Sequence, residues 1–196
     1  IEKLKHVCDA RKGEPIFGLT MIVFKGRTVL VADTNVEDFP SAKRLVEISK
    51  SCVRVSKLFG FDPKVAFLSH STFGKPISRN TKHVRDAINM LKDEKVNFDF
   101  DGEMQPDVAL NPIYQDVYPF SKIVGKANIL IMPALHSAAI STKLMKSFGG
   151  AKLIGPLLIG LDLPIEVAPL RSTTSDILNL ASIAAYSADV IDYNKD

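Results

Sequence analysis

Apolar runs with the length of buried strands alternate along this chain with stretches of helical periodicity. In the middle of the chain, residues 128–133 form a continuous apolar run ended by proline, as in a strand buried on both faces of a parallel sheet. Residues 138–148 predict a helix, capped by Ser137 or a neighbour and ended by the glycines at 149–150. A second apolar run at residues 153–161 completes a strand–helix–strand unit, whose crossover we expect to be right-handed.

Three other stretches predict amphipathic helices. They are residues 41–58, with Ser41 as N-cap and Gly60 as the stop, residues 80–91, and a final helix that begins at Ser172 or a following threonine. Apolar side chains recur at three- or four-residue spacing in each, so each should bury one face. The positions expected to face a core are Ile140, Leu144 and Phe148 in the central helix, then Leu45, Ile48, Cys52 and Val55, then Val84, Ala87, Ile88 and Leu91, and finally Ile177, Leu180, Ile183 and Ala184.

Shorter apolar runs predict the remaining strands. Residues 15–23 and 28–32 flank a glycine-containing turn and predict an antiparallel hairpin. Residues 63–68 and 98–100 predict strands that each lead into a polar loop, and residues 164–168 predict a last strand. Strands that alternate with helices are typical of parallel sheets. The fold class is therefore α/β, a three-layer α/β/α sandwich with a mostly parallel sheet and one antiparallel hairpin.

Polar loops follow several of the predicted strands, and in such sheets ligands bind beyond the carboxyl ends of the strands. The loops at residues 133–137 and 155–156 are therefore candidate walls of a site. Residues 69–74 are rich in hydroxyl groups and end in glycine, which suits an anion, although a plain turn would have the same composition. The polar loop at residues 33–36 is either a ligand loop or a turn.

Two kinds of side chain in these loops could carry chemistry. Asp101, Glu103 and Asp107 place three carboxylates within seven residues, which permits acid–base or metal chemistry. The alternative is that Asp101 caps the next helix and Glu103 pairs with a lysine. His136 could face the crevice or be a hydrogen-bonded structural group. The residues alone predict a binding site for a polar or anionic small molecule.

Composition narrows the function classes. The chain has 196 residues, of which 46% are hydrophobic and 24% charged, and its net charge is +3. The lysines and arginines are scattered and form no basic tract, so we expect no nucleic-acid partner. No apolar run approaches the ~20 residues that cross a bilayer and no signal peptide opens the chain, so we expect no membrane partner and a cytoplasmic location. Cys8 and Cys52 should be reduced and structural. The sequence has no Walker loop, GxGxxG or GxSxG motif, and no histidine has metal-ligand spacing, so we expect no metal in this chain.

Four regions, in their order and spacing, resemble the phosphate acetyltransferase (phosphotransacetylase) family over nearly the whole chain. They are residues 69–74 (SHSTFG), 101–104 (DGEM) with 107–111 (DVALN), 118–121 (YPFS) and 155–161 (GPLLIGL). Within that family, the chain is similar to the acetyltransferase-like domain at the C terminus of long bacterial NADP-dependent malic enzymes. The segments that carry this likeness are residues 26–34 (GRTVLVADT), 132–143 (MPALHSAAISTK) and 175–179 (SDILN).

The resemblance implies a two-lobed α/β fold, with lobes like those of isocitrate and isopropylmalate dehydrogenases, whose crevice takes coenzyme A or acetyl-CoA against phosphate. Residues 1–14 would be a connector from a missing upstream lobe, residues 15–168 the second lobe, and residues 169–196 the helix that returns toward the first lobe. The resemblance also implies homo-oligomers, because family members pair through this lobe. The effector-binding residues that it implies are Ser71, Thr72, Gly74, Asp101, Glu103, His136, Ser137, Gly155 and Arg171.

The likeness breaks at the residues that perform the family's chemistry. Family enzymes carry a Ser-Arg pair followed after a few residues by an aspartate that acts as base. Asp176 matches the aspartate, but Pro169 and Leu170 stand at the positions of the pair, and Arg171 is one place late. Met21 stands near the position of a cysteine that lines the family's crevice. Without the serine and arginine, a developing negative charge would lose its main electrostatic support.

We therefore expect a non-catalytic, acetyl-CoA-sensing and oligomerising domain of an NADP-dependent malic enzyme. Acetyl-CoA or CoA would be its ligand, while NADP and a divalent metal would bind only upstream, where malate is converted to pyruvate and CO2. Two alternatives stay open. One is a working phosphate acyltransferase, and the other is a structural dimerisation module that binds no ligand.

Overall fold

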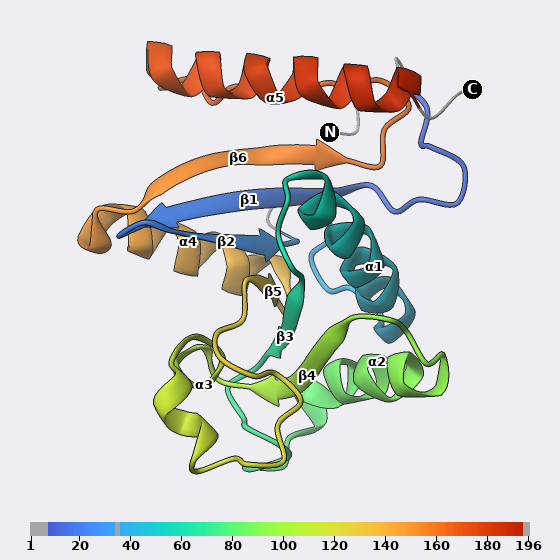
Figure 1. Cartoon of the computed structure of the whole chain (residues 1–196), viewed down its shortest axis with the longest axis vertical. Helices are drawn as coiled ribbons and strands as arrows, with labels where there is room; N and C mark the ends of the chain where they lie inside the picture. The colour runs from blue at the N-terminus through green and yellow to red at the C-terminus, as the bar shows by residue number, and fades with distance from the viewer. Residues whose placement is uncertain (1–7, 34–35, 194–196) are drawn as a thin grey trace.

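A six-stranded mixed sheet forms the centre of the molecule in the computed structural model, which describes residues 8–33 and 36–193 (Figure 1). The strands are β1 (Phe17–Phe24), β2 (Arg27–Ala32), β3 (Lys64–Leu68), β4 (Asp99–Met104), β5 (Ile129–Ile131) and β6 (Lys152–Ile159). They lie in the order β4-β3-β5-β2-β1-β6, in which the first four are parallel neighbours and β1 is antiparallel to both β2 and β6. The predicted mostly parallel sheet with one antiparallel hairpin is confirmed.

Helices flank the sheet on both of its faces. They are α1 (Ala42–Leu58), α2 (Lys82–Asp93), α3 (Pro106–Leu110), α4 (Leu135–Gly149) and α5 (Thr174–Tyr193), with the 3-10 turns η2 (Arg79–Thr81) and η3 (Pro112–Gln115). In β3, Val65 and Phe67 join the core under α1 and α2, whereas Ala66 and Leu68 join the core under α3 and α4. This alternation explains why the strands are apolar on both faces. None of the helices in the described part of the chain is long and apolar enough to cross a bilayer.

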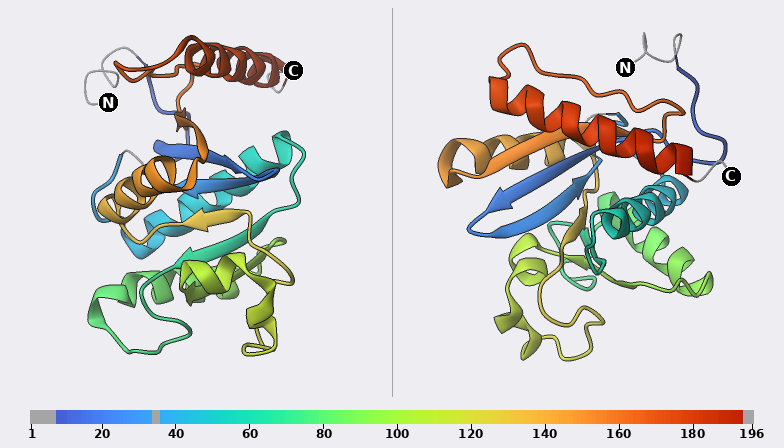
Figure 2. Two further views of the ribbon diagram at one scale, coloured as in Figure 1. Left: turned by 90° about the vertical axis from the view of Figure 1, so that its left-hand side faces the viewer. Right: turned by 45° about the horizontal axis from the view of Figure 1, so that its top comes forward.

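Helix α5 lies along β6, at the end of the sheet that is farthest from α2 and α3 (Figure 2). Leu180 is buried there and joins the core cluster that contains α1. The Tyr186 hydroxyl donates to the Leu58 carbonyl at 2.8 Å and its ring stacks on Phe59. By contrast, Ile177 in the first turn is 52% exposed, so the prediction that it faces a core is wrong.

Several local signals act as predicted. Ser41 is the N-cap of α1 and its Oγ accepts a hydrogen bond from the Arg44 N–H at 3.2 Å. Gly150 ends α4 with a φ of 63°, in the left-handed region that glycine adopts at low cost. Cys8 and Cys52 are buried free thiols. The strand–helix–strand unit forms as β5, α4 and β6, and its two strands run in the same direction with β2 and β1 between them.

Helix α4 differs from the prediction in two ways. It begins at Leu135 with Ala134 as N-cap, so Ser137 lies in the first turn and is not the cap. The face predicted to be buried is exposed, and Ala138 and Thr142 are the buried residues instead. The exposed fractions are 58% for Ile140, 50% for Leu144 and 86% for Phe148. Four-residue spacing identifies an apolar stripe but not its partner, and here the small side chains permit close packing on the sheet.

Two predicted loops are parts of strands. Asp101 and Glu103 lie inside β4, not in the loop after it, because the strand continues to Met104. Gly155 lies inside β6, where the register against β1 shifts between Leu19 and Met21. A Cβ at this glycine would lie 2.8 Å from the Leu19 carbonyl oxygen, which explains the need for glycine in a bulged strand. Gly155 therefore does not form the wall of a loop site.

The predicted strand at residues 164–168 does not form. A single bridge joins Leu157 to Glu166, and the segment lies against the free edge of β6. The prolines at residues 164 and 169 lack the N–H that a second ladder would need.

In the loop at residues 33–36, the structure describes Asp33 and Val36, which are joined by a hydrogen bond typical of a turn. The Asp33 carboxylate accepts hydrogen bonds from the N–H groups of Gly18, Val36 and Glu37 at 2.8, 3.2 and 3.0 Å. The middle of the predicted ligand loop, residues 34–35, lies outside the described residues.

Candidate functional site

A hollow of about 530 Å³ opens at the sheet edge where β3 and β5 end. This volume lies within the range of small-molecule sites. Its lining comes from the segment before α1 (Phe39 and Pro40), the residues after β3 (Ser69 and His70), η2 (Asn80 and Thr81), the first turn of α2 (His83), and the turn from β5 into α4 (Pro133, Ala134, His136 and Ser137). Of the two predicted walls, residues 133–137 contribute to this lining and residues 155–156 do not, and the residues after β3 join it because the carboxyl ends of parallel strands meet at one edge.

Two helices begin at this hollow. Thr81 is the N-cap of α2 and Ala134 is the N-cap of α4, and neither has a side-chain capping hydrogen bond. A helix N-terminus carries a partial positive charge and unpaired N–H groups. At α2 the first N–H, of Lys82, is already used by the Arg79 carbonyl of η2. At α4 the Leu135 N–H is used by the Asp38 carbonyl at 3.1 Å, while His136 and Ser137 line the hollow. The arrangement favours a ligand with negative charge.

Histidines contribute three of the lining side chains. The His83 Nε2 lies 2.9 Å from the Pro133 carbonyl and, because a carbonyl only accepts, this nitrogen carries the proton. His136 packs against the exposed ring of Phe39, with ring centroids 5.5 Å apart. Of the two alternatives for His136, the structure places its side chain in the lining of the hollow. Sequence reasoning missed His83, which lies on α2, and Phe39, which lies between β2 and α1 beyond the polar loop at residues 33–36.

Four of the predicted effector residues are buried, and none of the four lines the hollow. They are Ser71, Thr72, Asp101 and Glu103. Glu103 accepts hydrogen bonds from Ser71 and from the Gly74 N–H, and it pairs with Arg85, so the predicted alternative of a lysine partner is wrong. Asp101 accepts from the Lys122 N–H at 2.7 Å and from its neighbour Gly102 at 2.9 Å, so it closes a loop and caps no helix.

The remaining predicted residues lie elsewhere. Asp176 accepts a hydrogen bond from the Thr173 N–H at 2.9 Å, and this bond, with Lys146 and Lys152 nearby, lowers the pKa of its carboxyl. Lys152 is the first residue of β6, the outermost strand on one side of the sheet. Asp176 therefore lies beside the start of this outer strand, whereas the hollow lies where β3 and β5 end. Pro169, Leu170 and Arg171 are exposed in the segment before α5. The structure therefore does not bring the matched aspartate to the hollow.

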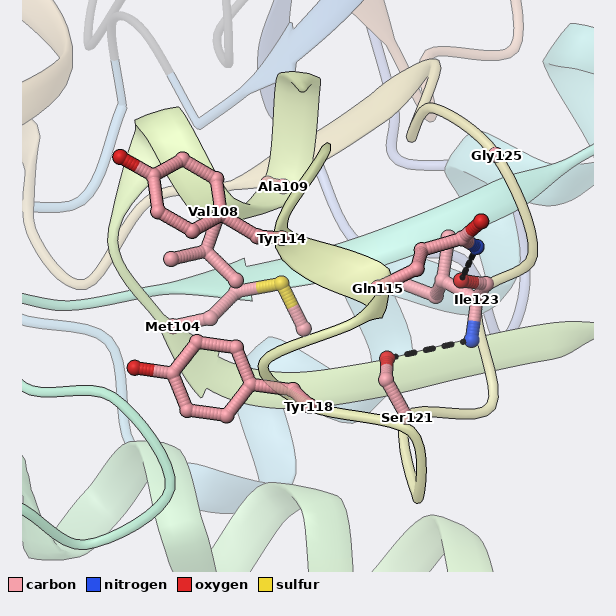
Figure 3. Close-up of a pocket in the computed structure, with 9 residues that line it drawn as sticks. All are labelled: Met104, Val108, Ala109, Tyr114, Gln115, Tyr118, Ser121, Ile123 and Gly125. Carbon is pink, nitrogen blue, oxygen red and sulfur yellow. Dashed lines mark hydrogen bonds between the residues drawn. The ribbon is translucent and has the colours of Figure 1, made fainter. Parts of the chain in front are cut away.

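A second pocket, beneath α3 and η3, holds about 10 Å³, room for one water molecule (Figure 3). Its wall includes Tyr114, Tyr118 and Gln115, and the Gln115 amide donates to the Ile123 carbonyl at 3.1 Å. This pocket is too small for an organic ligand. Among the described residues, no group of three His, Cys, Asp or Glu side chains gathers in a way that could hold a metal ion.

Comparison with known proteins finds similarity to two kinds of protein. The chain is 44% identical over 188 residues to an NADP-dependent malic enzyme of Rhizobium meliloti, covering 96% of this chain and 25% of the relative. It is 34% identical over 158 residues to a phosphate acetyltransferase of Bacillus subtilis, covering 80% of this chain and 49% of the relative. The chain thus spans about a quarter of the malic enzyme and about half of the acetyltransferase.

Solved structures give the same answer. A phosphotransacetylase from Streptococcus pyogenes superposes with a TM-score of 0.86 at 30% identity, covering 93% of this chain and 56% of that one. The EutD phosphotransacetylase from Staphylococcus aureus superposes with a TM-score of 0.84 at 28% identity, covering 94% and 58%. The model of the phosphate acetyl/butaryl transferase family matches residues 2–185. The resemblance inferred from the sequence motifs is confirmed, and the chain belongs to the phosphate acetyl/butaryl transferase family.

Proposed function

We propose that this chain is the acetyltransferase-like domain of an NADP-dependent malic enzyme, and that it binds acetyl-CoA or coenzyme A in the hollow without transferring the acetyl group. The observation that carries the proposal is the hollow of about 530 Å³ onto which two uncapped helix N-termini open. Such a site suits a large ligand with phosphate groups. The 44% identity to a malic enzyme over 96% of the chain supports the part of the proposal that makes this domain a piece of such an enzyme, which we call the parent protein.

The chemistry of the hollow supports a binding role and argues against catalysis. Its lining residues, all in the described part of the chain, include no lysine, arginine, aspartate or glutamate. Acyl transfer to phosphate develops negative charge, which enzymes stabilise with aimed donors or cations. Pro169 and Leu170 supply neither, and Asp176 lies at the other edge of the sheet.

In this proposal the conversion of malate to pyruvate and CO2, with its NADP and divalent metal, takes place in another part of the parent protein. The setting would be the cytoplasm. The domain would report the acetyl-CoA level to the catalytic part, as a regulatory unit.

Isothermal titration calorimetry with acetyl-CoA and coenzyme A tests the binding role. Ser137→Glu places a negative charge in the first turn of α4, so it should weaken both ligands. Ser147→Glu, on the exposed last turn of the same helix, is the matched control and should leave binding unchanged. Absence of binding to the unsubstituted chain, or equal effects of the two variants, would refute the proposal.

A working phosphate acyltransferase is the competing function, supported by the 34% identity to the Bacillus subtilis enzyme. Its test is formation of acetyl phosphate from acetyl-CoA and phosphate. We expect no formation above the uncatalysed rate. Turnover that disappears in Asp176→Ala would establish this competitor in place of the regulatory role.

A self-association role is favoured by the exposed apolar stripe on α4. Ile140, Leu144 and Phe148 are each at least half exposed and lie on one helix face. We propose that a second copy of this chain covers the stripe. Sedimentation velocity should show a dimer that Phe148→Glu dissociates and Ser147→Glu does not. A monomer at all concentrations would leave the stripe to another partner and refute this role.

A further inference from the structure

One loop, residues 69–81, builds a large part of the wall of the hollow. It joins β3 to α2 and supplies Ser69, His70, Asn80 and Thr81 to the lining. The two lining pairs lie at the two ends of the loop, which passes beside the end of β4 (Figure 1). Ordering a loop of this length has an entropic cost, so the wall stays in place only if interactions hold both ends.

Glu103, on β4, holds the first half of the loop. Its carboxylate is 1% exposed, and Oε1 accepts hydrogen bonds from Ser71 Oγ at 2.8 Å and from the Gly74 N–H at 3.2 Å. Its backbone carbonyl accepts from the Phe73 N–H at 2.7 Å. Because the Ser71 proton is committed to Glu103, the Ser69 hydroxyl must be the donor in its 3.1 Å contact with Ser71. Glu103 therefore holds Ser69, which is a lining residue, in place through Ser71.

Arg85, on α2, holds the second half. Its Nη1 donates to Thr81 Oγ1 at 2.7 Å and to Glu103 Oε1 at 3.2 Å. Its Nη2 donates to the Ser78 carbonyl at 2.8 Å. Hydrogen bonds in which one partner is charged are stronger than neutral ones. One ion pair thus ties both halves of the loop to β4 and α2.

We propose that Glu103 and Arg85 act together as a positioning pair for the hollow, and that the two ends of the loop, at the lining residues Ser69 and Thr81, are the parts of the wall that they place. Neither charged residue is among those that line the hollow. The role therefore differs from the direct effector contact that the sequence predicted for Glu103. The inference rests on the proposed binding function, which it deepens by naming what sets the shape of the site.

Glu103→Gln, Arg85→Gln and the double variant test the pair, with Asp86→Asn as the matched control. Asp86 pairs with Lys82 at 2.6 Å on the exposed side of the same helix. In calorimetry with coenzyme A as the probe, each single variant should bind about ten- to hundredfold more weakly, as expected when hydrogen bonds to a charged group that hold the wall are lost. The double variant should bind no more weakly than the worse single variant, because the two residues act as one unit. The control should bind normally.

Histidine imidazole signals in proton NMR of the ligand-free protein provide a second readout. His70 lies on the loop, whereas His136 lies on α4. In Glu103→Gln we expect the His70 signal to move or broaden while the His136 signal stays, which a general loss of stability would not produce. If this variant does not fold, Arg85→Lys allows the same tests, because one ammonium cannot replace the guanidinium fork.

The outcomes separate the two proposals. An unsubstituted chain that does not bind coenzyme A refutes the binding function, and it leaves the NMR test of the loop intact. A His70 signal that does not move, or equal changes in both histidines, overturns the positioning role. Normal affinity in all three variants overturns it as well.

Discussion

Replacing Glu166 with glutamine should stabilise this domain at alkaline pH. Glu166 lies on the segment that covers the free edge of β6, and its Oε2 accepts a hydrogen bond from the Leu158 N–H at 3.1 Å. Burial raises the pKa of the Glu166 carboxyl from 4.5 to about 7, although the Leu158 N–H favours the charged form. The native state therefore prefers the protonated acid, and a neutral amide can accept the same hydrogen bond.

The sign and size of the change in the free energy of unfolding follow from the difference in proton binding between the native and unfolded states. Between pH 4.5 and about 7 the unfolded chain has released this proton while the native state still holds it. The free energy of unfolding therefore falls as pH rises through this window and stays low above it. A pKa rise of about 2.5 units corresponds to at most about 3 kcal/mol at 1.36 kcal/mol per unit. Partial exposure of Glu166 to solvent reduces this, so we expect about 1–3 kcal/mol.

Urea unfolding at pH 5 and pH 8 measures the effect. Glu166→Gln should exceed the unsubstituted chain by less than about 1 kcal/mol at pH 5, which lies just above the ordinary pKa of 4.5, and by about 1–3 kcal/mol at pH 8. Asp162→Asn, an exposed neighbour on the same segment, is the control for loss of a negative charge and should show no such difference. A gain of equal size at both pH values, or no gain at pH 8, would refute the reasoning.

Three further predictions concern the backbone, a thiol and a helix cap. In urea unfolding, Gly160→Ala should lower the free energy of unfolding by more than about 2 kcal/mol, because a Cβ there would lie 2.1 Å from a backbone oxygen and the residue has a φ of +91°. The control is Gly149→Ala, at a helix position in open space, which should raise the free energy of unfolding by up to about 1 kcal/mol. Burial raises the pKa of the Cys52 thiol well above its ordinary value, so a thiol reagent at pH 8 should label it only after urea is added, and native labelling would contradict the packing. Asp176→Ala should speed hydrogen exchange in the first turn of α5, because Asp176 and Thr173 cap this turn reciprocally. Acidification below the ordinary carboxyl pKa should have the same effect in the unsubstituted chain, since the lowered pKa of Asp176 means that its charged form stabilises the cap. Unchanged exchange in both experiments would exclude this cap.

The candidate site was predictable only where it follows from strand ends. The turn from β5 into α4 was predicted as a site wall and lines the hollow, as do the first residues after β3, where the sequence left an anion site and a plain turn open. The other predicted wall, at residues 155–156, does not line it. Glu103 was predicted to bind an effector, but it is used to hold a loop that lies far from it in sequence. His83 and Phe39 were not predicted at all, because His83 meets the Pro133 carbonyl across 50 residues of sequence. Such a contact depends on how α2 packs against the end of β5.

The sequence by itself determined the local features and the family. Periodicity predicted the strands and helices, Ser41 and Gly150 mark helix ends, and the motifs identify the acetyltransferase family. These signals act over a few residues, through backbone conformation and side-chain spacing.

Only the tertiary structure decided which polar groups are buried and which apolar face of α4 is exposed. Asp101 and Glu103 look like site residues in the sequence, yet their donors come from other segments, so their role depends on the packing of those segments. Likewise, Ala138 faces the sheet and Phe148 faces outward because small side chains permit close packing there. An apolar stripe in the sequence indicates that a helix face should be covered, but the packing of the other elements determines which residues cover it.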